Sequence, residues 1–147
     1  MMSAELIDAY RRTTYIVEAS HVSPIAIRIG ERCGAVDQLL IDRGASRWAF
    51  VTAYNPRSTR LSDGENQARH RKLVQRVGAL SREMLPGRGV GDDASWAPEI
   101  SLFIFEMEPG EARALGREFE QNAVVAGALG GCAELLVVAA DFGENDN

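Results

Sequence analysis

The fold of this chain is decided by one apolar stretch that ends in polar groups, Trp48-Ala49-Phe50-Val51-Thr52-Ala53-Tyr54-Asn55-Pro56. Successive side chains of a β-strand point to opposite faces, and both faces of this stretch are mainly apolar as far as Val51. We therefore expect a central strand that is covered on both sides. Pro56 has no backbone N–H to continue the ladder, so the strand should end there. Tyr54 and Asn55 then lie at the end of a rigid element, where α/β proteins often hold ligands.

The remaining periodicity predicts an α/β (α+β) domain with a single mixed β-sheet of about five to six strands and helices packed on it. The expected strands cover residues 13–17, 25–29, 48–55, 100–107, 123–129 and 133–138. The expected helices cover residues 3–11, 31–43 and 62–84, and a fourth begins at 109. Gly130-Gly131 predicts a C-terminal β-hairpin. Residues 1–140 should form one globular domain, followed by a flexible acidic tail at 141–147.

A glycine-rich segment, Pro86-Gly87-Arg88-Gly89-Val90-Gly91-Asp92-Asp93, interrupts this periodicity. It is not a phosphate-binding P-loop, because no Lys-Ser or Lys-Thr follows the glycines and no strand is predicted before them. We expect a mobile loop instead, with residues 86–98 able to close over a site.

Charge is distributed unevenly around a net value of −5. Residues 57–91 carry eight basic and three acidic side chains, whereas residues 92–147 carry two basic and twelve acidic ones. The basic helix can attract phosphate or another anion. Alternatively, it faces the acidic C-terminal third of the same molecule. The sequence leaves both interpretations open.

Several classes of protein are not expected from the composition. No apolar run approaches the roughly 20 residues of a membrane-spanning helix, and the first residues lack the order of a secretory signal. A cytoplasmic location follows as the expectation. The two cysteines and two histidines lack the spacing of a transition-metal site, so no metal is predicted.

A series of short motifs carries a family resemblance. In chain order these are Tyr10-Arg11-x-Thr13-x-Tyr15, Ile27-Arg28-Ile29-Gly30, Thr52-Ala53-Tyr54-Asn55-Pro56, Glu65-Asn66, Trp96 with Glu99-x-Ser101, and Phe119-x-Gln121-Asn122-Ala123-Val124-Val125. Together they resemble a bacterial family, domain-of-unknown-function family 3293, from about residue 10 to the last strand. The resemblance implies a small, stand-alone cytoplasmic protein. The resemblance implies no activity, substrate, cofactor or catalytic residue.

The candidate ligand site is therefore predicted from the residues alone. Asn66 and Arg69 are three positions apart and share a face at the start of the basic helix. Helix N-termini favour anions because their free N–H groups and the helix dipole present positive charge. Tyr54, Asn55, Asn66 and Arg69 are thus expected to surround a phosphate or carboxylate group. For Asn55 the alternative is a turn residue that bonds its own backbone.

A second group of polar residues follows later in the chain. Glu99 is the candidate catalytic acid or base, and Ser101 points to the same side of its strand. Gln121, at a helix end, completes the candidate ligand-binding set. For Ser101 the alternative is a backbone hydrogen bond. The two groups meet only if the strands before Tyr54 and after Glu99 are antiparallel, whereas the usual right-handed crossover would place them at opposite edges.

Two functions remain. The first is a domain that binds, or acts on, a small anionic or nucleotide-like ligand at the edge of its sheet. The second is a non-enzymatic interaction module for a protein partner or, less favoured, for nucleic acid through the Arg-rich helix 62–84. The acidic net charge opposes nucleic acid, because phosphate contacts dominate such affinity. Neither a reaction nor a cofactor follows from the sequence.

Overall fold

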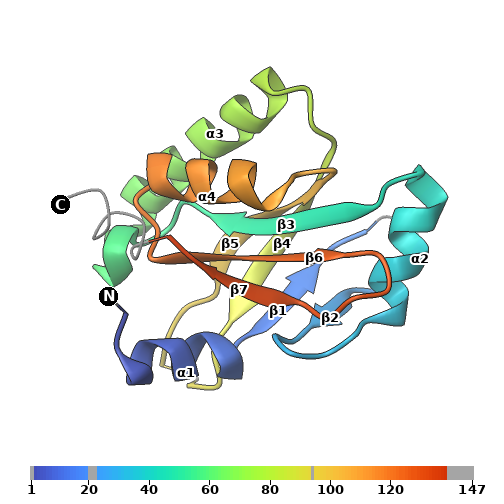
Figure 1. Cartoon of the computed structure of the whole chain (residues 1–147). Helices are drawn as coiled ribbons and strands as arrows, with labels where there is room; N and C mark the ends of the chain where they lie inside the picture. The colour runs from blue at the N-terminus through green and yellow to red at the C-terminus, as the bar shows by residue number, and fades with distance from the viewer. Residues whose placement is uncertain (1, 20–22, 94, 139–147) are drawn as a thin grey trace, which may run out of the picture.

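The computed structural model describes residues 2–19, 23–93 and 95–138, which form seven strands and four α-helices (Figure 1). The strands are β1 (Thr14–Val17), β2 (Ile25–Ile27), β3 (Arg47–Thr52), β4 (Met84–Val90), β5 (Glu99–Phe105), β6 (Ala123–Ala128) and β7 (Glu134–Val137). The helices are α1 (Ala4–Arg12), α2 (Gly34–Arg43), α3 (Asp63–Ala79) and α4 (Pro109–Glu118). The predicted tail at 141–147 lies outside the described residues.

The strands form one sheet in the order β2-β1-β4-β5-β3-β6-β7. Every pair of neighbouring strands is antiparallel, so the predicted mixed sheet of five to six strands is wrong in both respects. The missing strand is β4. It follows the crossover through α3 and runs in the same direction as β3. The turn after β4 then brings β5 back between the two, antiparallel to both.

The sheet is strongly curled, so that its two ends approach each other. An isolated bridge pairs Ile29, just after β2, with Ala133, just before β7. The Gly30 N–H donates to the Ala133 carbonyl at 2.8 Å. A second bridge pairs Arg32 with Cys132. This pairing holds residues 31–33 extended, which explains why α2 begins at Gly34 and not at residue 31 as predicted.

Helices cover both faces of the sheet (Figure 1). On one face, α3 and α4 pack through Leu73, Val77 and Leu115 against strand residues such as Ile104. On the other face, α2 packs through Leu40, in the same cluster as the Trp48 and Phe103 rings. The stretch from Trp48 to Val51 is fully buried, as its two apolar faces predict. The central position of β3 is therefore confirmed.

The glycine-rich segment is a strand and not the predicted loop. Its Gly87 pairs with Val17 on one side and Ser101 on the other, inside the sheet. A Cβ at Gly87 would lie 2.8 Å from Cε2 of Phe50 and 2.9 Å from the carbonyl oxygen of Ile16. Because glycine is a poor strand former, the residue pattern does not predict this strand. The close packing of the Phe50 ring requires glycine at position 87. The connection from β4 to β5 is therefore limited to residues 91–98.

The basic helix α3 begins with the predicted capping box. The Ser62 hydroxyl accepts from the Glu65 N–H, and the Glu65 carboxylate accepts from the Ser62 N–H. These bonds satisfy two of the free N–H groups of the first turn. The helix ends at Ala79 and not at residue 84, because Met84 already pairs with Ile104 as the first residue of β4.

Candidate functional site

The polar ends of β3 and β5 meet at one end of the sheet. Because the two strands are antiparallel, Thr52 lies opposite Ser101, and the chain after β3 comes close to the start of β5. There, Nδ2 of Asn55 donates to Oε2 of Glu99 at 2.8 Å. The two groups of predicted site residues are therefore brought together, through the strand direction that the crossover rule disfavoured.

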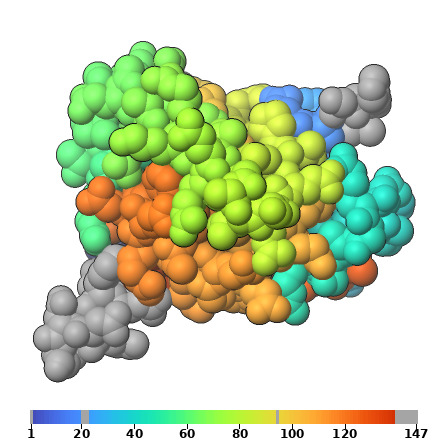
Figure 2. Space-filling view, turned by 90° about the horizontal axis from the view of Figure 1, so that it is seen from above, coloured from blue at the N-terminus to red at the C-terminus, as the bar shows by residue number. Residues whose placement is uncertain are grey.

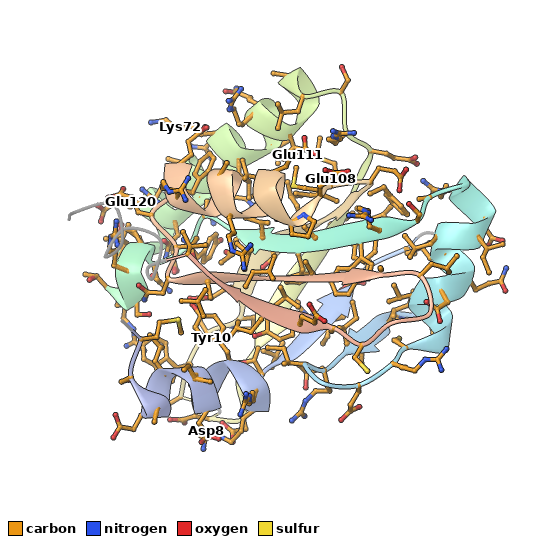
Figure 3. The ribbon with its side chains drawn as sticks, in the orientation of Figure 1. Asp8, Tyr10, Lys72, Glu108, Glu111 and Glu120 are labelled. Carbon is orange, nitrogen blue, oxygen red and sulfur yellow. The ribbon has the colours of Figure 1, made fainter. Side chains whose placement is uncertain are left out.

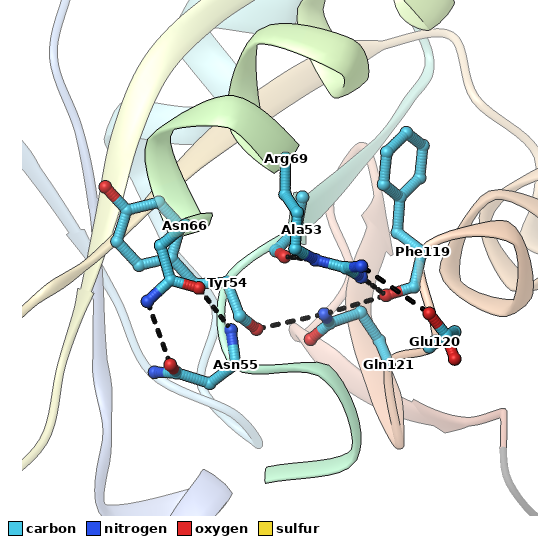
Figure 4. Close-up of polar contacts among 8 residues, drawn as sticks. All are labelled: Ala53, Tyr54, Asn55, Asn66, Arg69, Phe119, Glu120 and Gln121. Atoms are coloured by element: carbon cyan, nitrogen blue, oxygen red, sulfur yellow. Dashed lines mark hydrogen bonds and ion pairs between the residues drawn. The ribbon is translucent and has the colours of Figure 1, made fainter. Parts of the chain in front are cut away.

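Asn55 and Asn66 form a buried pair beneath this contact (Figure 4). The Asn55 N–H donates to Oδ1 of Asn66 at 2.9 Å, and Nδ2 of Asn66 donates to Oδ1 of Asn55 at 2.9 Å. Oδ1 of Asn55 also accepts from the Leu61 N–H at 3.0 Å. Asn55 itself is left-handed, with a φ of 47°, a conformation that asparagine tolerates better than most residues. Asn55 thus has a turn conformation, but its side chain bonds Leu61, Asn66 and Glu99 and not its own backbone as the alternative predicted.

Glu99 is partly buried, and Asn55 is the side chain that bonds its carboxyl group. Burial raises the pKa of Glu99, and the hydrogen bond from Asn55 opposes part of that increase. Among the described residues, no ion pair includes Glu99. Its charge raises the pKa of two tyrosines on neighbouring elements, Tyr10 of α1 and Tyr15 of β1, whose pKa values burial has already raised.

The Tyr54 phenol makes none of the polar contacts drawn in Figure 4. Its ring meets that of His70 edge to face, with 6.5 Å between the centroids. Burial is the largest cause that raises the pKa of Tyr54, followed by Asp63 and Glu99. Burial also lowers the pKa of His70. Burial thus disfavours the charged forms of both the phenol and the imidazole.

Arg69 and Gln121 hold the backbone in place. Nε of Arg69 donates to the Ala53 carbonyl at 2.7 Å, and its Nη2 donates to that of Phe119 (Figure 4). Nε2 of Gln121 donates to the carbonyls of Tyr54 and Phe119 at 3.1 and 3.2 Å. Both side chains tie the end of β3 to the end of α4.

Ser101 adopts the alternative that the sequence left open. Its buried hydroxyl donates to the backbone carbonyl of Glu99 at 2.9 Å.

Among the described residues, no group of three or more His, Cys, Asp or Glu side chains is arranged to hold a metal ion. Within the same part of the chain, no helix is both long and apolar enough to cross a membrane.

A groove lies on the outer surface between α3 and α4, the two helices that lie side by side in Figure 2. It has a volume of about 500 Å³. Its lining residues are Arg69, Lys72, Gln75, Arg76, Ala79, Glu118 and Phe119. Three cations thus face one carboxylate. Figure 3 shows Lys72 on the same side of the sheet as α4, with Tyr10 on the opposite side.

Three arginines of the basic segment pair with carboxylates of the acidic C-terminal third. Arg69 pairs with Glu120 at 3.5 Å, Nε of Arg76 with Glu118 at 3.0 Å, and Nη2 of Arg82 with Glu111 at 2.8 Å. The second interpretation of the charge distribution is confirmed for these three side chains. Lys72, the one lysine of the chain, is exposed between Arg69 and Arg76 on the helix surface.

A family model described as "Protein of unknown function (DUF3293)" matches residues 51–124, which is half of the chain. The chain belongs to this family. The match runs from the end of β3 through α3, β4, β5 and α4 to the start of β6. It includes the predicted site residues from Tyr54 to Gln121 and the groove. No curated protein and no solved structure matches the chain.

Within this DUF3293 region, sequence reasoning missed the contribution of Glu118 and Phe119 to a surface groove. The cations Arg69, Lys72 and Arg76 were visible as one stripe of a helix, because their spacing of three and four places them on one face. The opposite wall depends on α4 packing beside α3, for which the sequence carries no local signal.

Proposed function

We propose that the protein binds a small anionic ligand in the groove between α3 and α4. The observation that carries this proposal is the composition of the groove, in which three cations oppose a single carboxylate. A concave surface lined by one sign of charge concentrates ions of the opposite sign. A phosphate or carboxylate group of a nucleotide, a sugar phosphate or an organic acid has the required chemistry.

Lys72 is the main contact that we propose for this anion. Arg69 donates to two backbone carbonyls, so its position is fixed by the fold. Arg76 bonds Glu118 through Nε, and this bond leaves its two Nη groups to point elsewhere. Lys72 lies four residues before Arg76 on the same helix face, so its ammonium group and the Arg76 guanidinium can contact one oxyanion.

This location differs from the sheet edge predicted by the sequence. At the edge, the carboxyl of Glu99 lies beside the Asn55 carboxamide, and Asp63 is close enough to raise the pKa of Tyr54. Two acidic groups repel an anion. Arg69 contacts both places, because it bonds the end of β3 and also lines the groove. We therefore still propose an anionic ligand, as predicted from the sequence, but we place it in the groove between α3 and α4 and not at the sheet edge.

The test is thermal unfolding with inorganic phosphate, a sugar phosphate, adenosine monophosphate and citrate at constant ionic strength. A ligand that binds only the native state stabilises it by about 2.7 kcal/mol at a hundred times its dissociation constant. We expect a saturable rise in melting temperature that Lys72→Ala abolishes. Arg71→Ala is the matched control, because Arg71 is an exposed cation of α3 outside the groove.

The single lysine allows a second, direct readout. An amine-specific acylating reagent has one side-chain target in this chain, and mass spectrometry separates it from the α-amino group. A bound anion should slow acylation of Lys72 and leave the rate at the N-terminus unchanged. An acylation rate that no tested anion changes, together with no melting shift, would contradict the proposal and favour the interaction module.

A further inference from the structure

The carboxylate that lines the α3–α4 groove is bonded to one of the groove's own cations. Both oxygens of Glu118 accept from the same group, Nε of Arg76, at 3.0 Å. A guanidinium carries several N–H donors in a planar fork, which bonds an oxyanion best through two parallel hydrogen bonds. Here a single N–H is shared between two oxygens. Glu118 therefore uses only part of the bonding capacity of Arg76.

Little energy holds this pair together. The side chains of Arg76 and Glu118 are 46% and 43% exposed, and ion pairs exposed to this degree contribute little in water. Glu118 is also the last residue of α4, where the helix dipole presents partial negative charge and disfavours a carboxylate. The pair can therefore open at low cost, with the Glu118 carboxylate returning to water.

Lys72 is the neighbouring cation, about one helical turn before Arg76 on the same face of α3. Among the described residues, no ion pair includes Lys72. An oxyanion between the two side chains can bond the ammonium and the guanidinium together. Glu118, by contrast, bonds Arg76 and leaves Lys72 without a carboxylate.

Replacement of Glu118 at Arg76 favours a phosphoryl group over a carboxylate. A ligand carboxylate at Arg76 re-forms the kind of bond that it breaks, so its net gain is confined to Lys72. A phosphoryl group has more acceptor oxygens and more negative charge. It can therefore bond the fork of Arg76 and the ammonium of Lys72 at the same time.

We propose that Glu118 is an internal competitor for the anion site and that a phosphoryl group displaces it from Arg76 on binding. Because Glu118 lines the groove of the proposed function, this role rests on anion binding there. In the free protein the Glu118 carboxylate occupies Arg76, and a ligand must first break that pair. Glu118 thus limits the affinity of the groove. Inorganic phosphate and phosphate monoesters share the required group.

Protection of Lys72 from an amine-acylating reagent measures binding on the full chain. The phosphate concentration that gives half of the maximal protection is compared between variants. We expect Glu118→Gln to lower this concentration by about 1.5- to 5-fold, the range that corresponds to loss of an exposed ion pair. If Glu118 instead positioned Arg76 for the ligand, the same variant would need more phosphate, and this result would overturn the proposal.

Glu120→Gln is the matched control, because it removes the same charge two residues away. Glu120 pairs with Arg69 at 3.5 Å, and Arg69 stays fixed by its bonds to the carbonyls of Ala53 and Phe119. Removal of Glu120 therefore frees no cation that a ligand could use. We expect phosphate binding close to that of the wild type. An equal gain in Glu118→Gln and Glu120→Gln would mean that both carboxylates act by general repulsion, against the proposed displacement.

Acetate and glucose 6-phosphate test the class of ligand. Acetate should protect Lys72 only at roughly tenfold higher concentrations than phosphate, since it lacks the additional charge-assisted hydrogen bond. Equal half-saturation by acetate and phosphate would contradict the assignment to a phosphoryl group. Tighter binding of glucose 6-phosphate than of inorganic phosphate would identify a monoester as the ligand, and the reverse order would identify the free ion.

Two results separate the role of Glu118 from anion binding itself. Phosphate that protects Lys72 in the wild type, and no better in Glu118→Gln, would contradict the role of Glu118 alone. Absence of protection in both proteins would contradict anion binding in the groove and, with it, the role of Glu118.

Discussion

Asn66 shows how one buried side chain can fix a connection of the backbone. It is 4% exposed and bonds both the N–H and the side-chain oxygen of Asn55. In the unfolded chain these groups bond to water, so each hydrogen bond adds little to the free energy of unfolding as long as both partners are present. Removal of one partner is different, because it leaves the other polar group buried and unpaired.

We therefore expect Asn66→Ala to lower the free energy of unfolding by about 1–3 kcal/mol, the cost of leaving the buried N–H of Asn55 without its partner. Urea unfolding monitored by circular dichroism measures this loss. Asn122→Ala is the control, since Asn122 makes a single exposed bond to Ser58 and should cost less than about 1 kcal/mol. Equal losses in the two variants would mean that burial of the Asn55–Asn66 pair has no special importance.

At the scale of elements, β4 decides the topology. It is central in the sheet and contains a proline and two glycines. With β4 present, the chain returns through a turn and places β5 antiparallel to β3. Without it, the same crossover would lead directly to β5, and Asn55 would be separated from Glu99. The Asn55–Glu99 contact therefore depends on a strand whose composition predicts a loop.

Gly87 and Gly89 provide a matched pair for testing why β4 contains glycine. A Cβ at Gly87 would lie 2.8 Å from the Phe50 ring, whereas the nearest atom to a Cβ at Gly89 is Cγ2 of Thr13 at 3.7 Å. We expect Gly87→Ala to cost about 1–3 kcal/mol by overpacking. Gly89→Ala should change stability by less than about 0.5 kcal/mol, as a substitution free of such a clash does. Urea unfolding of both variants measures this difference, and the opposite order would contradict the close packing of Phe50 on β4.

At the scale of the whole molecule, the charge distribution becomes a contact between two helices. Three basic side chains of the middle third pair with three carboxylates of the last third, on or just after α3 and α4. These pairs are at least partly exposed, so each contributes little to stability in water. Among the described residues that line the groove, these pairs leave Lys72 as the cation without a carboxylate partner.

Arg82 and Glu111 form a pair with two short hydrogen bonds, at 2.8 and 2.9 Å, which lower the pKa of Glu111. Glu111→Gln removes the charge and preserves the capping position, since glutamine also serves there. We expect a loss of about 0.2–1 kcal/mol at low salt. The loss should shrink in 1 M NaCl, where the Debye length is about 3 Å.

Urea unfolding at the two salt concentrations measures this effect. Glu134→Gln is the control, because Glu134 is exposed on β7 and lies outside the helix pairs. If the Glu111→Gln loss were the same at both salt concentrations, a packing effect and not charge pairing would explain it.

The sequence by itself determined the elements that carry strong local signals. The apolar faces of Trp48–Val51 predict a buried central strand, and Ser62 with Glu65 predicts the start of α3. The paired glycines at 130–131 predict the C-terminal hairpin. Each of these signals arises from side-chain alternation, capping or turn chemistry within a few residues, so neighbouring positions suffice to specify it.

Only the tertiary structure decided the strand order, the position of β4 and the contacts of the site. Gly87 belongs to a strand because the Phe50 ring, distant in sequence, packs against it. Glu99 reaches Asn55 because that strand reverses the direction of β5. The groove exists because α4 packs beside α3. These features depend on contacts between segments far apart in the chain, which no local sequence pattern specifies.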